Sequence, residues 1–188
     1  MESPDNKTDN ALRRKWCLQM AQALAYVHKK GIIHSNISDT NVLVHETNQT
    51  IDLLLADFGG SKCVELSLNG HLLPDIPFGH PDVTDFESPS LDVFSLGVLF
   101  YVIVTGHYPF HEGPAPKNEE HLVYYDYAEQ KYEQGEFPDL SGVMFGDIIA
   151  ACCCERRFTT ADHVIDALCA EMQNDSEDPG RDVASITK

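Results

Sequence analysis

A nearly unbroken apolar run at residues 91–105 constrains the fold of this chain more than any other part of the sequence. The segment LDVFSLGVLFYVIVT is apolar almost all round a helix, but it is shorter than the roughly 20 residues needed to cross a bilayer. Gly106 and Pro109 end the run. We therefore expect a buried central helix with the rest of the chain packed around it.

The remaining segments are shorter, and most of them are helical. In residues 11–30 the apolar positions recur at helical spacing, and Gly31 follows as a stop signal. Two extended runs at 42–45 and 51–56, joined by the turn-rich segment ETNQT, predict a small β-hairpin. Residues 57–89 show no sustained period and predict a long irregular segment. Further helices are expected near residues 121–134, 143–153 and 160–173.

Size and charge exclude several classes of protein. With 188 residues and 43% hydrophobic content, the chain is large enough for one globular domain, expected at 11–172 between a loose lead-in at 1–10 and a disordered tail at 173–188. The net charge of −17 argues against nucleic acid and membrane surfaces as partners. The start lacks a secretion signal, and the six cysteines lack the spacing of a zinc site. We expect an intracellular protein, cytoplasmic or nuclear.

Three ordered segments carry a family resemblance. They are IIHSNISDTNVLV at 32–44, ADFGGS at 56–61 and LDVFSLGVLFYVIVTGHYPF at 91–110. In this order they resemble the catalytic loop, the DFG motif and the central helix of the C-terminal lobe of protein kinases. Together with the segment QGEFPDL, the first two also resemble a subgroup of fungal kinase-like proteins. The resemblance implies a mainly α fold, a kinase-like C-lobe with a small β-hairpin.

A weaker match follows the DFG segment. HPDV at 80–83 stands where kinases have the APE motif, and Arg157 resembles the arginine that pairs with the glutamate of that motif. The resemblance therefore implies an ion pair between Asp82 and Arg157.

The catalytic positions depart from the family pattern. Asn36 stands where kinases have the aspartate that accepts the substrate proton, and an amide has no basic oxygen in this pH range. Ser38 replaces the lysine that neutralises the transferring phosphate, and Ser35 replaces the arginine that holds a phosphorylated activation segment. These three changes predict impaired catalysis.

The metal-binding positions are retained. Asn41 and Asp57 match the two kinase residues that hold magnesium on the nucleotide phosphates. Leu43, with Leu99 and Ile103, matches apolar positions beneath the adenine ring, although plain core packing explains these three residues better. Mg-ATP is expected as a cofactor only if residual binding persists.

Several other residues in these motifs have structural roles in the resemblance. His34 is expected to stack under Phe58, which with Gly59 completes the DFG match, and Asp92 is expected to cap the backbone of the catalytic loop. Cys152, Cys153 and Cys154 form no metal site, because successive helical residues point about 100° apart. Tyrosines in 121–134 are explained mainly by helix packing, and only exposed ones would matter to a partner.

About ten residues precede the first helix, which leaves no room for an N-lobe with its Gly-rich loop and its lysine–glutamate pair. We therefore expect a pseudokinase-type module that binds protein partners, which include a kinase N-lobe or a kinase. The alternatives are an ATP-dependent serine/threonine kinase whose N-lobe is missing from this sequence or supplied by another chain, and a nonfunctional remnant.

Overall fold

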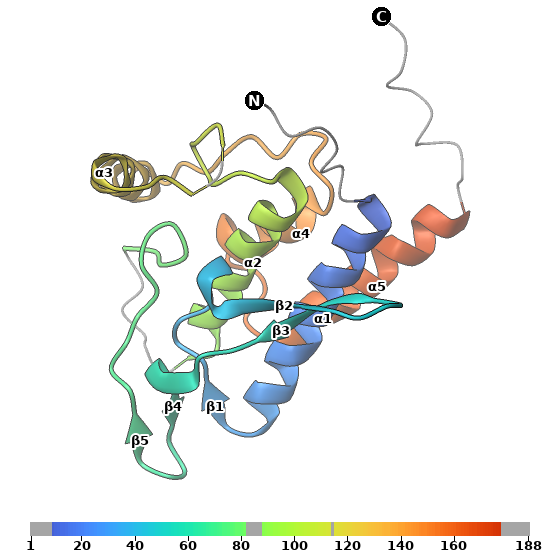
Figure 1. Ribbon diagram of the computed structural model, residues 1–188, viewed down its shortest axis with the longest axis horizontal. Coiled ribbons are helices and arrows are strands. Elements are labelled where there is room, and N and C mark those ends of the chain that lie inside the picture. Colours follow the sequence, from blue (N-terminus) through green and yellow to red (C-terminus); the bar gives the residue numbers. More distant parts are fainter. Residues whose placement is uncertain (1–8, 82–87, 114, 178–188) are drawn as a thin grey trace, which may run out of the picture.

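The computed structural model describes residues 9–81, 88–113 and 115–177, with the side chains of 175–177 left aside. Five helices and two small antiparallel sheets make up this part of the chain (Figure 1). The helices are α1 (Asn10–Lys29), α2 (Ser90–Thr105), α3 (Glu119–Glu133), α4 (Gly146–Cys153) and α5 (Ala161–Glu177). The strands are β1 (Ile32–Ile33), β2 (Val42–Glu46), β3 (Ile51–Leu55), β4 (Lys62–Cys63) and β5 (Leu68–Asn69).

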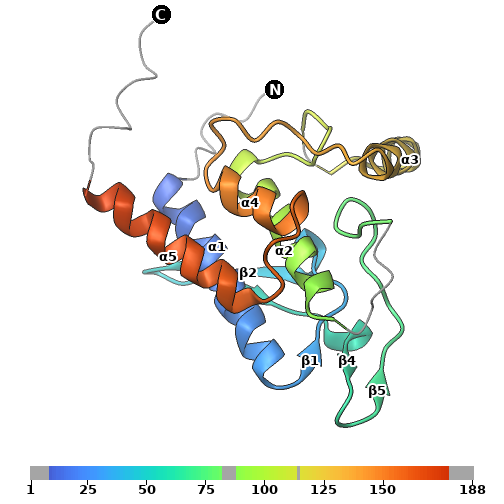
Figure 2. The ribbon, with the colours of Figure 1, turned by 180° about the vertical axis from the view of Figure 1, so that it is seen from behind.

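The expected central helix is α2, which is buried from Leu91 to Tyr101. Figures 1 and 2 show α1 and α5 running beside each other next to α2, with α4 packed against α2. Gly97 permits the close α2–α4 approach, because a Cβ at this position would lie 2.5 Å from the Cβ of Cys152. The mainly α fold with a small hairpin is confirmed, and no helix in the described residues is long and apolar enough to span a membrane.

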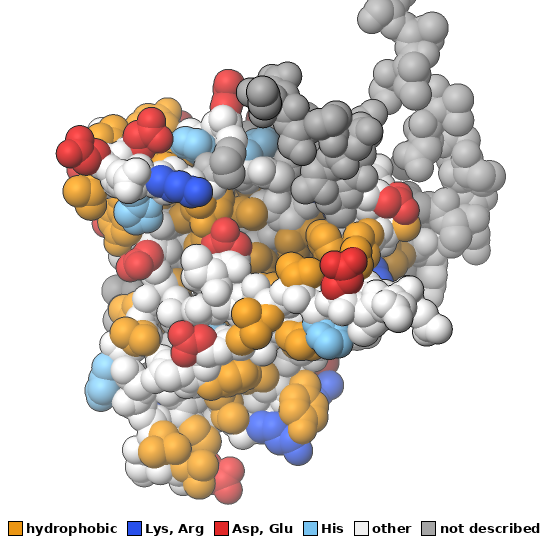
Figure 3. All heavy atoms as spheres, in the orientation of Figure 1, with side chains coloured by type: hydrophobic (Ala, Val, Ile, Leu, Met, Phe, Trp, Pro, Cys, Tyr) orange, Lys and Arg blue, Asp and Glu red, His pale blue; other side chains and the backbone are white. Residues whose placement is uncertain are grey.

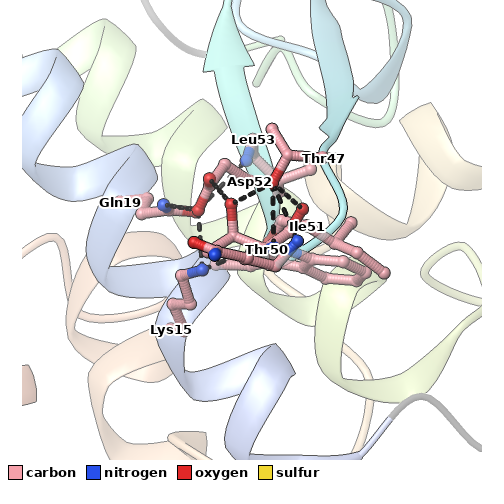
Figure 4. Close-up of polar contacts among 9 residues, drawn as sticks. Lys15, Gln19, Thr47, Thr50, Ile51, Asp52 and Leu53 are labelled. Atoms are coloured by element: carbon pink, nitrogen blue, oxygen red, sulfur yellow. Dashed lines mark hydrogen bonds and ion pairs between the residues drawn. The ribbon is translucent and has the colours of Figure 1, made fainter.

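The predicted hairpin is present as β2 and β3, which pair from Val42–Leu55 to Glu46–Ile51. Side chains of α1 hold it against the helices (Figure 4). The Gln19 side chain donates to Asp52 at 2.7 Å and accepts from the Leu53 amide at 3.1 Å. Lys15 lies 2.6 Å from the same carboxylate and, through this bond, holds the pKa of Asp52 well below its ordinary range. These contacts from α1 to β3 therefore fix the position of the hairpin.

The segment from 57 to 89 was predicted to be irregular, and this prediction was wrong in one respect. β4 and β5 lie within it and join β1 in a three-stranded sheet of order β1-β4-β5. Each of these strands has two residues, too few to show an alternating pattern in the sequence. Gly70 closes the turn after β5, since a Cβ there would lie 2.1 Å from the Gly59 carbonyl oxygen.

The other helices follow the predicted order with shifted ends. α5 continues to Glu177, beyond the expected end at Gln173, so the first residues of the expected tail are helical. The expected lead-in lies mostly outside the described residues, and α1 begins at Asn10.

Candidate catalytic and nucleotide site

A single buried carboxylate organises the loop between β1 and β2. Asp92, at the start of α2, accepts the backbone N–H of His34 at 2.7 Å and that of Ser35 at 2.8 Å. Ser35 has φ +66°, which turns both amides toward the same side chain. The ring of His28 from α1 lies 2.9 Å from the same carboxylate. Asp92 is fully buried and thus ties the loop to both helices.

His34 joins the loop to the DFG segment. Its Nε2 lies 3.0 Å from the Ala56 carbonyl oxygen and therefore carries the proton, and its ring meets that of Phe58 edge to face, 4.8 Å between centroids. The Ser61 hydroxyl donates to the His34 carbonyl oxygen at 3.1 Å. Burial lowers the pKa of His34 below its ordinary value. A neutral His34 thus acts as a packing and hydrogen-bonding residue.

Asn41 and Asp57 are brought to one place by the backbone. The amide of Ala56 donates to the Asn41 carbonyl oxygen at 2.9 Å, which puts the next residue, Asp57, beside Asn41. The Asn41 side-chain NH2 donates to the Asn36 carbonyl oxygen at 2.8 Å, so its other atom, the amide oxygen, stays available. Asp57 has φ +57° and accepts from the Gly59 amide at 3.1 Å. These two oxygen donors fit Mg²⁺ whose remaining ligands come from phosphates and water.

Positions 36 and 38 of the loop carry no cationic or basic group. Asn36 is half-buried, and the Ser38 hydroxyl is paired with that of Thr40 at 2.8 Å. Asp39, which the sequence analysis did not single out, accepts from the Tyr108 hydroxyl at 2.7 Å. Burial and this bond raise the pKa of Tyr108. Asp39 thus anchors the loop to the segment that follows α2 rather than serving as a base.

The three residues that match positions beneath an adenine ring, Leu43, Leu99 and Ile103, differ in their burial in the structure. Leu99 is buried in the core of α2 and Ile103 is half-buried, whereas Leu43 on β2 is 56% exposed. The prediction of core packing for all three residues is therefore wrong for Leu43. Leu54, paired with Leu43 across the hairpin, is 48% exposed, and Phe58 is exposed as well. An apolar surface therefore adjoins the catalytic loop.

The ion pair expected between Asp82 and Arg157 falls outside the described residues, because Asp82 is not among them. The exposed Arg157 bonds through Nε to Glu155 at 2.9 Å, and its guanidinium lies over the Phe158 ring.

The cysteine run lies on α4 and directly after it. Cys152 and Cys153 are buried and Cys154 is exposed, and all three are free thiols. Burial raises the pKa of Cys152 to about 12. Within the described ranges, no cluster of three His, Cys, Asp or Glu side chains has the arrangement of a metal site.

Comparison with known proteins adds an independent observation. The family model for the protein kinase domain matches residues 3–167. The chain belongs to the protein kinase family. The match covers the catalytic loop, the DFG segment and α2, which carry the motifs of the kinase C-terminal lobe.

Similar proteins include the serine/threonine-protein kinase ppk25 of Schizosaccharomyces pombe, 33% identical over 114 residues that cover 58% of this chain and 26% of that kinase. An Aurora kinase of Yarrowia lipolytica is 33% identical over 125 residues, 65% of this chain and 33% of the relative. The serine/threonine-protein kinase pim-2 of Danio rerio is 32% identical over 107 residues, which cover 55% of this chain and 34% of that kinase. The aligned part of this protein kinase family member thus spans between 26% and 34% of each relative's length.

Proposed function

We propose that this chain is a catalytically impaired, kinase-like domain whose role is to bind a protein partner. The observation that carries the proposal is Asn36 at the position of the kinase general base. Removing a general base costs roughly 10²- to 10⁴-fold in rate. Ser35 and Ser38 take the places of two cationic residues that act on phosphate, so the remaining loop has lost charge as well as the base.

The retained metal positions leave a weak nucleotide site within this proposal. Asn41 and Asp57 would hold Mg²⁺ on the phosphates of ATP, and the metal would supply charge neutralisation there. Leu43 offers an apolar surface to an adenine ring from one side. An adenine ring with one apolar wall is buried less than in an enclosed pocket, so we expect the described part of the chain, on its own, to bind Mg-ATP weakly or not at all.

The partner would bind the apolar surface beside the loop. Leu43, Leu54 and Phe58 are exposed there, and the exposed Leu66 and Leu68 lie in the turn before β5 and on β5. Figure 3 shows hydrophobic side chains over the hairpin and near the turn between β4 and β5. A cavity of about 400 Å³ lies between Phe58, Leu66 and Leu68. Exposed apolar surface of this kind marks interaction sites, and a kinase N-lobe or another kinase would fit it.

We also propose that the protein is located in the cytoplasm or nucleus. Its six free thiols support this location, because reducing compartments keep thiols free.

The first experiment separates impaired from active catalysis. Phosphotransfer from Mg-ATP to a serine/threonine peptide library would be measured for the natural protein, for Asn36→Asp, and for Asn48→Asp in the exposed hairpin turn as a matched control. The proposal expects background transfer by the natural protein and the control, with any gain confined to Asn36→Asp. Turnover by the natural protein in the usual kinase range of about 1–100 s⁻¹ would contradict it.

The second experiment tests the surface. Leu54→Asp should abolish a stable complex isolated from the source cells, whereas His45→Asp, exposed on the same hairpin, should preserve it. Equal recovery of the partner with both variants would exclude this surface as the binding site.

A second candidate function is an ATP-dependent protein serine/threonine kinase. Asn41 and Asp57 favour it, as do the names of the relatives, two of which are serine/threonine-protein kinases. If the chain has this second function, the first experiment should show turnover by the natural protein of about 1–100 s⁻¹, the result that contradicts the first proposal.

A further inference from the structure

The outward face of α3 carries apolar side chains that the fold does not use. Leu122, Val123 and Tyr127 are 68%, 73% and 46% exposed. The opposite face of the helix supplies the core contacts, through Tyr124 and other buried residues. Figures 1 and 2 place α3 at one end of the molecule, away from the hairpin. This face is therefore separate from the surface of the proposed function.

The aromatic member of this face is held in place before any partner binds. The Tyr127 ring meets that of Phe110 edge to face, 6.2 Å between centroids. Lys131 lies over the same ring, 5.7 Å from its centroid. An ordered aromatic ring loses little conformational freedom on binding, which favours it as an anchor.

Carboxylates surround these apolar residues. Glu119, Glu120, Asp126 and Glu133 are exposed on α3, and none of them forms an ion pair within the ranges that the structure describes. Two lysines lie near these carboxylates in the described chain: Lys131 is already bonded to Glu136 at 2.6 Å, and the exposed Lys117 precedes α3, so four exposed carboxylates outnumber the one remaining lysine. Figure 3 shows acidic and hydrophobic side chains together at this end of the molecule. A matching surface would combine apolar side chains with Lys or Arg.

We propose that the outward face of α3 docks a short protein segment with two or three apolar side chains flanked by Lys or Arg. A second copy of the chain fits less well, because it would bring the same carboxylates and a net charge of −17 against each other. Burial of Leu122, Val123 and Tyr127 supplies the affinity, and the carboxylates select basic partners.

The test is a selection that does not assume the partner. Random 16-residue peptides displayed on phage are selected on the full chain and counter-selected on Val123→Glu. The proposal expects enriched peptides in which two or three apolar residues are flanked by Lys or Arg. Peptides without basic residues, or no enrichment over the counter-selection, would overturn it.

Matched variants then locate the site. The enriched peptide should bind Leu122→Ala/Val123→Ala about tenfold or more weakly, and Asp126→Asn should weaken it and reduce its salt dependence. Val44→Ala and Asp166→Asn, an exposed valine and an exposed aspartate elsewhere, should leave the affinity unchanged. Circular dichroism checks that each variant is folded. A dimer of the natural chain that Val123→Glu dissociates would assign the face to a second copy and overturn the proposal.

Discussion

One carboxylate, Asp92, fixes the backbone of the catalytic loop. We expect Asp92→Ala to lower the free energy of unfolding by about 3 kcal/mol, because the amides of His34 and Ser35 lose their acceptor inside the protein. The change is measured as a shift in the urea midpoint at unchanged slope. Asp166→Ala, exposed on α5, should stay within about 0.5 kcal/mol of the natural protein. Equal effects of the two variants would show that the loop does not depend on Asp92.

The buried His34 predicts a pH dependence of stability. Because burial lowers its pKa below the ordinary value of 6.5, the unfolded chain binds this proton more readily than the folded one. The contribution of His34 to stability is therefore complete above pH 6.5 and is lost as the pH falls below that value.

This loss is measured as the fall in urea midpoint between about pH 7.5 and pH 5.5. The fall should be smaller in His34→Phe than in the natural protein, and unchanged in His45→Phe, whose ring is exposed on the hairpin. The same fall in all three proteins would contradict the assignment.

Individual residues were predictable only where a motif fixed them. His34, Asn41, Asp57 and Asp92 stand in motifs with fixed spacing, and the structure brings them into one network. The bond between Asp39 and Tyr108 spans 69 residues, and a hydroxyl at that distance leaves no pattern in the sequence. The exposure of Leu43 was missed for a related reason, since sequence alone does not say whether a partner covers one face of a hairpin.

At the scale of elements, α1 positions the hairpin that connects the catalytic loop to the DFG segment. We expect Gln19→Ala to increase hydrogen exchange at the Leu53 amide, because this amide loses its acceptor, and to lower stability by about 1 kcal/mol. Gln22→Ala, on the exposed side of the same helix, is the control and should change neither. Unchanged protection at Leu53 in the Gln19 variant would show that strand pairing alone holds the hairpin.

Long periodic elements were predictable and short ones were not. Helix α1 follows from apolar positions at helical spacing and α2 from an unbroken apolar run, and the hairpin follows from two extended runs with a turn between them. Strands β1, β4 and β5 have two residues each, so tertiary pairing rather than local preference forms them.

At the scale of the whole molecule, the thiols report opening of the core. Cys17, Cys152 and Cys153 are buried, and burial raises the pKa of each, whereas Cys154 is exposed. We expect Cys154 to react with iodoacetamide in the native protein, and Cys17, Cys152 and Cys153, three of the four buried thiols, to react only as fast as the protein unfolds. Mass spectrometry after peptide digestion gives the rate at each site. Modification of Cys153 at the rate of Cys154 would show that α4 opens without global unfolding.

Contact between α1 and α5 has a consequence for synthesis. Lys29 on α1 bonds to Asp162 on α5 across 133 residues of sequence. At about 5–20 residues per second, a ribosome needs roughly 7–27 s to make the stretch between them. During that interval the apolar side of α1 has no α5 to cover it. We therefore expect the nascent chain to bind chaperones that shield helices during translation, and its yield in cells to depend on how fast α5 emerges.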